Sequence, residues 1–309
     1  MTFVANSVAE DLAMRVFVTG ATGFIGSAVV ADLIAAGHQV LGLTRSDAGA
    51  AALVAAGAEA YPGSLEDLNG LRRGAAQSDG VIHTAFNHDF STYLANCEAD
   101  RVVIEALGSV LAGSARPLIV TSGTGMGAAP GRLVTEEDPP ARAADIPRAA
   151  SEEAAAAVGA QGVNVSVMRL PQVHDTEKQG LVTYAIAAAR EKGVSAYVGD
   201  GRNRWPAAHR LDTARLYRLA LEKAQPGARY HAVAEEGVPM RDIAEAIAGR
   251  LRVPAVSIAP EEAPAYFGWL AMFAGSDVPA SSLQTRNRLG WSPTGPGLIA
   301  DLEGMRADG

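Results

Sequence analysis

Short apolar runs alternate along the first half of the chain with longer segments in which small and apolar residues return at helical spacing. The runs predict strands at Arg15–Thr19, Gln39–Thr44, Glu59–Pro62, Gly80–Thr84, Pro117–Thr121 and Val163–Arg169. The longer segments predict helices at Gly26–Ala36, Ala48–Ala56, Leu68–Ala75, Tyr93–Ala112 and Ala149–Ala160. This alternation is typical of a parallel sheet with helices on both faces, which right-handed crossovers would wind into a Rossmann-type, doubly wound α/β fold.

The regular alternation of predicted strands and helices ends after Pro171. A predicted helix at Leu181–Lys192 leads to Gly199-Asp200-Gly201, a second helix is predicted at Thr213–Lys223, and proline and glycine punctuate the remainder. The change indicates a second, smaller lobe that follows the sheet.

The first predicted strand runs directly into three regularly spaced glycines, Gly20, Gly23 and Gly26. In a nucleotide-binding corner the first glycine permits the tight turn, the second lets the backbone approach a pyrophosphate, and the third lets helix and strand pack closely. The N–H groups at the start of the following helix favour phosphate. A glycine turn without a ligand is the alternative, but the strand before it and the helix after it favour a dinucleotide site.

With Thr19, Ala21, Thr22, Phe24 and Ile25 around the glycines, this segment resembles the extended short-chain dehydrogenase/reductase family. That family includes nucleotide-sugar epimerases, dehydratases and plant-type carbonyl reductases, and the resemblance extends over nearly the whole chain from Met14. The stretch Ala208–Ala214 resembles the point where the family's chain returns to its main domain. The resemblance therefore implies a Rossmann domain of residues 14–170 plus about 207–234, a substrate lobe of 171–206 and 235–309, and a tail of 1–13 without assigned function.

The end of the second predicted strand distinguishes the two nicotinamide cofactors. NAD-dependent enzymes usually carry a carboxylate there for the ribose 2′-hydroxyl, whereas this chain has Arg45 and Ser46. A guanidinium suits a 2′-phosphate by charge and by geometry, so we expect NADP(H), with a solvated surface arginine as the alternative. The resemblance implies further contacts with the cofactor from Gly20, Thr22, Gly23, Phe24, Ile25, Gly26, Ser64, Leu65, Thr84, Ala85, Thr121, Pro171 and Val173. His83, in the same resembling strand as Thr84, is expected to be structural.

In the family, chemistry uses a Ser or Thr together with a Tyr and a Lys four residues apart on one helical face. Ser122 matches the first position, but Arg148 and Glu152 stand where the Tyr and the Lys are expected. No tyrosine lies between Tyr93 and Tyr184, so a shift of register does not restore the pair. Three interpretations remain open: an exposed salt bridge, an Arg148 that stabilises a developing alkoxide, or a pair that binds the cofactor's ribose and diphosphate.

A reduction would then need another source of the proton. The candidates are water, His88, Tyr93, Tyr184 and His174, the last in a segment that resembles the family's stretch beside the nicotinamide. Asn87 and His88 follow the fourth predicted strand and either line a substrate pocket or form an exposed polar loop. The aromatic stretch from Tyr266 to Phe273 either walls that pocket or belongs to the core of the lobe.

Composition narrows the class of protein further. The formal charge of the 309-residue chain is −8, from 26 basic and 34 acidic residues, without a basic cluster, so nucleic acid is not an expected partner. The lone Cys97 excludes an internal disulfide and fits a reducing cytoplasm. Scattered histidines predict no metal site, and no apolar run is long enough to predict a membrane span.

Three functions are compatible with these residues. The first is an NADPH-dependent reductase of a small carbonyl or related substrate, and the second is a non-catalytic NADP(H) sensor or regulator. The third is a nucleotide-sugar epimerase or dehydratase, in which Arg286 and Arg288 would meet a pyrophosphate; the absent Tyr and Lys argue against it. A homodimer through Tyr93–Ala112 and Ser151–Gly159 is expected from the resemblance.

Overall fold

The computed structural model describes residues 13–126, 128–129 and 131–306, which form two compact units. The first unit comprises residues up to Ser122 together with 140–168 and 214–230, and the second comprises 123–139, 169–213 and 231 onward. The predicted tail of residues 1–13 lies almost wholly outside the described part. The structure also assigns residues 123–139 to the second unit, whereas the sequence placed them in the Rossmann domain. Val134 explains the difference, because it pairs with Ala280 in an isolated parallel bridge.

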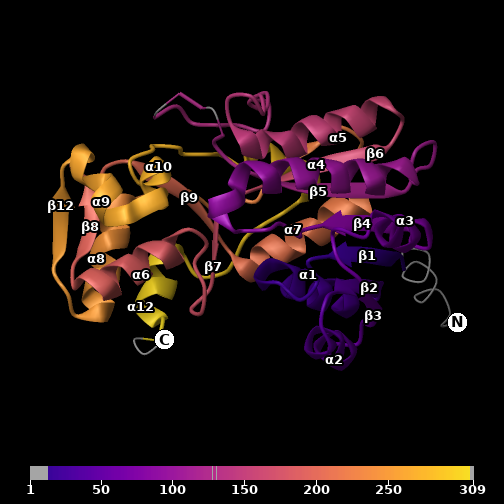
Figure 1. The fold of residues 1–309 in the computed structure, drawn as a ribbon, viewed down its shortest axis with the longest axis horizontal. Helices are drawn as coiled ribbons and strands as arrows, with labels where there is room; N and C mark the ends of the chain where they lie inside the picture. The colour runs from indigo at the N-terminus through magenta and orange to yellow at the C-terminus, as the bar shows by residue number, and fades with distance from the viewer. Residues whose placement is uncertain (1–12, 127, 130, 307–309) are drawn as a thin grey trace, which may run out of the picture. The chain divides into compact units, whose positions relative to one another are not determined.

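The first unit is built on a seven-stranded sheet in the order β10-β6-β5-β4-β1-β2-β3 (Figure 1). Neighbouring strands are parallel from β5 through β4, β1 and β2 to β3. The strands are β1 (Arg15–Thr19), β2 (Gln39–Thr44), β3 (Glu59–Pro62), β4 (Gly80–His83), β5 (Pro117–Gly123), β6 (Asn164–Leu170) and β10 (Arg229–His231). This confirms the predicted Rossmann-type α/β fold, and the six predicted strands end within two residues of the observed ones.

Helices cover both faces of this sheet. They are α1 (Phe24–Ala35), α2 (Asp47–Ala55), α3 (Leu68–Ala76), α4 (Tyr93–Ser109), α5 (Ala150–Ala160) and α7 (Arg210–Lys223), with single turns η2 (Phe90–Thr92) and η3 (Pro147–Ala149). On one face the α4 residues Ile104 and Leu107 join Phe17 of β1 and Val158 of α5 in a buried core. On the other face α1 and α7 lie together, with Arg218 of α7 donating to Asp32 of α1 at 2.7 Å. Figure 1 shows α4 beside α5 in the upper part of the unit, and α1 beside α7 at the height of β4, β1 and β2.

The second unit contains a three-stranded sheet in the order β11-β9-β7 and a parallel pair of β12 and β8. Its strands are β7 (Gln172–His174), β8 (Ser195–Val198), β9 (Arg204–His209), β11 (Glu235–Pro239) and β12 (Ala255–Ile258). Its helices are α6 (Val182–Lys192), α8 (Met240–Leu251), α9 (Ala263–Phe267), α10 (Ala271–Ala274), α11 (Leu283–Leu289) and α12 (Leu298–Gly304), with turns η4 (Pro260–Glu262) and η5 (Gly268–Leu270). Trp205, Ile243, Phe267 and Leu302 meet in its core, so most of the aromatic stretch from Tyr266 packs inside or against this core.

Candidate functional site

The glycine corner between β1 and α1 has the shape that a diphosphate requires. Gly20 has a φ of +70°, a conformation that side chains with a Cβ rarely adopt. The amide of Gly23 donates to the carbonyl of Gly20 at 2.9 Å, which closes the turn. A Cβ on Gly26 would lie only 2.0 Å from the Gly20 oxygen, so the helix approaches the turn as closely as it does only because this residue is glycine.

The start of α1 lies beside this turn. Its N-cap is Gly23, which has no side chain to accept a hydrogen bond, and no acidic residue stands in its first turn. The dipole of α1 and its first N–H groups therefore favour an anion at this end. Thr22, Phe24 and Ile25, which the sequence assigned to the cofactor, lie in this turn and the first turn of the helix.

The end of β4 borders the same turn. The Thr84 hydroxyl donates to the Thr19 carbonyl at 2.7 Å, and the Ala85 amide nitrogen lies 2.8 Å from where a Cβ on Gly20 would stand. Thr121, on β5, lies beside the end of β4, because its hydroxyl donates to the His83 carbonyl at 2.7 Å. The predicted residues Gly20, Thr84, Ala85 and Thr121 thus lie along one edge of the sheet, at the carboxyl ends of β1, β4 and β5.

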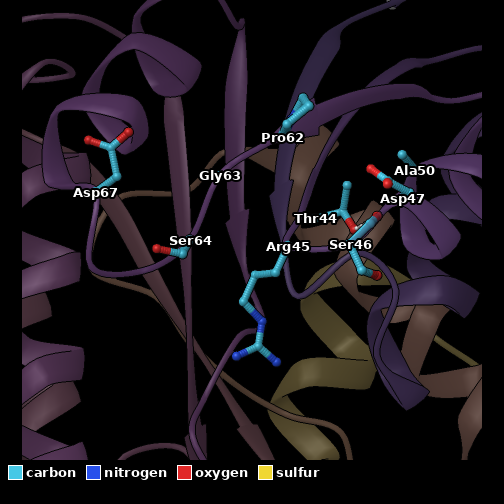
Figure 2. A pocket seen from close by; sticks show the side chains of 9 residues that line it. All are labelled: Thr44, Arg45, Ser46, Asp47, Ala50, Pro62, Gly63, Ser64 and Asp67. Atoms are coloured by element: carbon cyan, nitrogen blue, oxygen red, sulfur yellow. Dashed lines mark hydrogen bonds between the residues drawn. The ribbon is translucent and has the colours of Figure 1, made fainter.

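A pocket of about 330 Å³ opens at the carboxyl ends of β2 and β3. Arg45, Ser46 and Ser64 line it, together with Thr44, Asp47, Ala50, Pro62, Gly63 and Asp67. In Figure 2 the guanidinium of Arg45 extends from the loop after β2, and Ser64 and Asp67 lie on the segment after β3. A hydrogen bond from Ser64, and the charge of Arg45, hold the pKa of Glu66 below its usual value. Leu65 instead packs against the core of this unit.

These features fit a dinucleotide. The glycine cradle and the N-terminus of α1 would hold the diphosphate, and the pocket at β2 and β3 would hold the adenosine end, with Arg45 and Ser64 as donors. The Ser46 hydroxyl also caps α2, because it accepts the Gly49 amide at 3.1 Å.

Ser122 and Glu152 form a pair that the sequence did not predict. The Ser122 hydroxyl, at the end of β5, donates to Oε1 of Glu152 in the first turn of α5 at 2.8 Å. The two residues are 4% and 3% exposed. The interpretation of Glu152 as one half of an exposed salt bridge with Arg148 is therefore wrong: Glu152 is buried, and the carboxylate that pairs with Arg148 is Asp100.

Arg148 lies in a network of buried polar groups. Its guanidinium donates to Oδ2 of Asp100 at 3.0 Å, to the Thr121 carbonyl at 3.0 Å and to the Ser151 hydroxyl. The same guanidinium lies 4.1 Å from the centre of the Phe86 ring, in a cation–π contact. These three bonds tie both terminal nitrogens of the guanidinium into the fold, and a role of Arg148 toward an alkoxide or a ribose stays a prediction.

Asp100 joins this network to His83. His83 Nε2 lies 2.9 Å from Oδ1 of Asp100, its Nδ1 lies 2.6 Å from the Thr19 hydroxyl, and Ser151 also donates to Asp100. Burial alone would push the pKa of Asp100 up, but His83, Arg148 and Ser151 together hold it below its usual value. His83 is 1% exposed, which agrees with the structural role expected for it.

The loop after β4 carries the predicted substrate residues of the first unit. Asn87 donates to the side chain of Asn96 at 3.2 Å, and the His88 ring lies against Phe86 at 5.2 Å between ring centres. Tyr93 stacks on Phe90, and burial raises its pKa to about 12. A phenol with this pKa is poorly matched to proton transfer near neutral pH.

The site residues predicted in the second unit differ in how deeply they are buried. Val173 is a core residue of β7, and Pro171 lies just before that strand. His174 is fully buried, with Nδ1 2.6 Å from Oδ2 of Asp301 on α12. Tyr184, on α6, is 40% exposed and its ring lies 4.8 Å from that of Trp269.

His174 is not placed as a general acid. Burial lowers its pKa, although the Asp301 carboxylate acts in the opposite direction. A neutral imidazole enclosed by protein on all sides has no proton to give to a substrate at neutral pH. Its contacts instead fasten α12 to β7.

Two classes of site find no support in the described residues. Across 13–126, 128–129 and 131–306, no three His, Cys, Asp or Glu side chains converge as a metal ion would need. Within those same ranges, no helix is both long and apolar enough to cross a membrane.

This chain belongs to the NAD dependent epimerase/dehydratase family, whose sequence profile matches residues 16–233. An uncharacterized protein of Schizosaccharomyces pombe is 51% identical over 294 residues, which cover 94% of this chain and 98% of the relative. An uncharacterized protein of Saccharomyces cerevisiae is 44% identical over 292 residues, with 94% and 98% covered.

Solved structures show the same fold. A dTDP-glucose 4,6-dehydratase from Streptomyces venezuelae with NAD bound has a TM-score of 0.73 at 20% identity, covering 94% of this chain and 96% of that one. A UDP-glucose 4-epimerase from Thermus thermophilus in complex with NAD has a TM-score of 0.69 at 21% identity, with 94% and 97% covered. The expected relation to epimerases and dehydratases is thereby confirmed at the level of the family, and NAD is bound in both of these neighbouring structures.

Proposed function

We propose that this protein is an NADP(H)-dependent oxidoreductase that reduces a small carbonyl or related substrate. The position of Arg45 supports the preference for NADP(H) over NAD. It lines the pocket at the carboxyl ends of β2 and β3, where a carboxylate would select NAD. The bound nicotinamide would supply the hydride. Ser122, at the carboxyl end of β5, would orient the substrate oxygen.

The residues of the first unit support this proposal in separate ways. The glycine cradle and the start of α1 offer backbone N–H groups to a diphosphate, and Arg45 offers a charged fork to a 2′-phosphate. The buried bonds of Arg148 and Glu152 also favour a second candidate, a binder of NADP(H) without turnover, because they replace the Tyr and Lys that the resemblance leads one to expect.

Titration with NADPH and NADH tests the choice of cofactor. We expect the wild type to bind NADPH more tightly than NADH, and Arg45→Ala to weaken NADPH binding by about 10- to 100-fold while leaving NADH nearly unchanged, as for the loss of one charge-assisted hydrogen-bonding group. Arg142→Ala is the matched control, because the Arg142 side chain is 77% exposed and forms an ion pair with Asp145. Equal losses for both cofactors in Arg45→Ala would contradict the assignment.

Oxidation of NADPH in the presence of aldehydes, ketones and imines tests the reaction. Turnover of one substrate class supports the reductase. Tight NADPH binding with no turnover across the panel supports the non-catalytic binder instead.

A further inference from the structure

We propose that Gly49 determines the specificity of the cofactor site for a 2′-phosphate. Because this residue has no side chain, the first turn of α2 closes against Thr44, and this fixes Ser46 and Arg45 in the pocket at the carboxyl ends of β2 and β3. Gly49 acts through these residues, so it is a positioning residue. This inference rests on the proposed NADP(H)-dependent function.

Two segments of the chain form the walls of this pocket. Residues 44–47 and Ala50 form one wall, and residues 62–64 and Asp67 form the other. In Figure 2 the first wall runs from the end of β2 into the start of α2, and the Arg45 guanidinium extends from it. Gly49 lies within this first segment, so the position of the wall depends on how α2 begins.

Ser46 is bound to the first turn of α2 at two atoms. Its hydroxyl accepts the Gly49 amide at 3.1 Å, and its carbonyl accepts the Ala50 amide at 2.9 Å. The Thr44 hydroxyl also donates to the Ser46 carbonyl, at a longer distance of 3.4 Å. A shift of this turn therefore moves Ser46 and, with it, the adjacent Arg45.

A side chain at position 49 would collide with this arrangement. A Cβ on Gly49 would stand 2.2 Å from Oγ1 of Thr44. It would also stand 3.2 Å from the Ser46 hydroxyl oxygen and from Cγ2 of Thr22 in the glycine turn. Non-bonded atoms pack at about 3.5 Å, so the Thr44 hydroxyl or the start of α2 would have to move by about 1 Å. A binding group keeps its geometry only within about 0.5 Å.

Thr44 is held more firmly than the helix. Thr44 is 4% exposed, and its carbonyl accepts the Gly63 amide of the opposite wall at 2.9 Å. Its β-branched side chain also has few rotamers available. In α2, by contrast, Leu53 is the one buried residue. A Cβ at position 49 would therefore push the start of α2 outward and leave Thr44 in place.

Calorimetric titration with NADPH and NADH tests this inference through the ratio of the two dissociation constants. We expect Gly49→Ala to weaken NADPH binding about tenfold, as for the weakening of one charge-assisted hydrogen bond. NADH binding should weaken by less than about threefold, because the glycine turn still holds the diphosphate. A merely structural defect would weaken both cofactors alike, and thermal unfolding shows that each variant is folded.

Gly249→Ala is the matched control. Alanine is more favourable than glycine inside a helix, so neither substitution weakens its helix through propensity. Gly249 is an exposed residue of α8, where a Cβ would meet no described atom within 4 Å apart from the chain beside it. Both dissociation constants should be unchanged in this variant.

Substitutions of Thr44 test whether the collision is the cause. Thr44→Ala removes Oγ1 and makes room for the new Cβ, whereas Thr44→Val keeps an atom of similar size at that place. We expect Gly49→Ala to weaken NADPH binding by less than about twofold in the Thr44→Ala background and by about tenfold in the Thr44→Val background, each relative to its own parent. Equal losses in the two backgrounds would show that Gly49 does not act through Thr44.

The outcomes separate this inference from the proposed function. If Gly49→Ala weakens both cofactors equally, or neither, Gly49 does not determine the specificity and the inference is wrong. If the wild type binds NADPH and NADH equally, the NADP(H) assignment is wrong and so is this inference. A ratio that changes in Arg45→Ala but not in Gly49→Ala overturns the inference alone and leaves the assignment standing.

Discussion

Each unit of this protein buries a histidine against an aspartate, but the two pairs are completed differently. In the first unit both ring nitrogens of His83 have partners, and Asp100 also accepts from Arg148 and Ser151. In the second unit His174 Nδ1 meets Asp301, while His174 Nε2 is buried without a hydrogen-bond partner among the residues that the structure describes. A carboxylate oxygen of Glu235 lies 3.9 Å from that nitrogen.

The difference shows when a charged group is tolerated in the protein interior. A buried carboxylate is tolerated where a cation and several donors compensate for its lost hydration, as at Asp100. A histidine with one unpaired nitrogen stays neutral instead, and burial lowers the pKa of His174 accordingly. The first pair therefore acts as a fixed brace between β4, α4 and α5, whereas we expect the stability contributed by the second to depend on pH.

Removal of the carboxylate in the first unit should have the largest effect. Asp100→Asn leaves the Arg148 guanidinium, on a side chain that is 14% exposed, beside a neutral amide, and we expect a loss of about 3 kcal/mol in the free energy of unfolding, at the lower end of the range for a broken buried ion pair. Urea unfolding followed by circular dichroism measures it. Glu98→Gln on the same helix is the control, since the side chain of Glu98 is 53% exposed. Equal effects of the two substitutions would show that the network is not a brace.

The corresponding change in the second unit should cost less. Asp301→Asn removes the partner of a neutral ring rather than of a fixed charge, so we expect a loss of about 1–3 kcal/mol. Hydrogen exchange of the α12 amides reports it locally. Glu303→Gln, at an exposed position of the same helix, should leave the exchange unchanged. A loss of stability as large as that of Asp100→Asn would contradict the proposed difference between the two pairs.

The smallest effect is a dependence on pH. Because the pKa of His174 is lowered in the folded protein, the unfolded chain binds more protons below its own histidine pKa of about 6.5. Stability contributed by the neutral ring is therefore fully present above that pH. It is lost as the pH falls toward the lowered folded pKa, at no more than about 1.4 kcal/mol per pH unit.

His174→Gln isolates this contribution. The variant should show a shallower decline of stability between pH 6.5 and lower values than the wild type, measured by urea unfolding at a series of pH values. Parallel declines in the two proteins would mean that His174 does not titrate differently on folding.

The strands of the first unit were predictable because their signal is local. A glycine directly follows β1, glycines stand two residues before β2 and β3, and the structure begins and ends these strands at the predicted residues. The segment 123–139 has no such local signal. It belongs to the second unit through long-range contacts that cannot be predicted from its own sequence. For example, Glu136 accepts a hydrogen bond from the Thr285 amide at 2.7 Å.

The sequence by itself determined the dinucleotide corner, since a φ of +70° at Gly20 and the close approach at Gly26 each require a residue without a Cβ. It also determined that Arg45 follows β2, where the pocket lies. Only the tertiary structure decided the partners of the ionisable groups, because Ser122 meets Glu152 across 30 residues, Arg148 meets Asp100 across 48, and His174 meets Asp301 across 127. Sequence spacing constrains neighbours on one helix or strand, whereas packing alone selects which of several distant carboxylates a buried donor reaches.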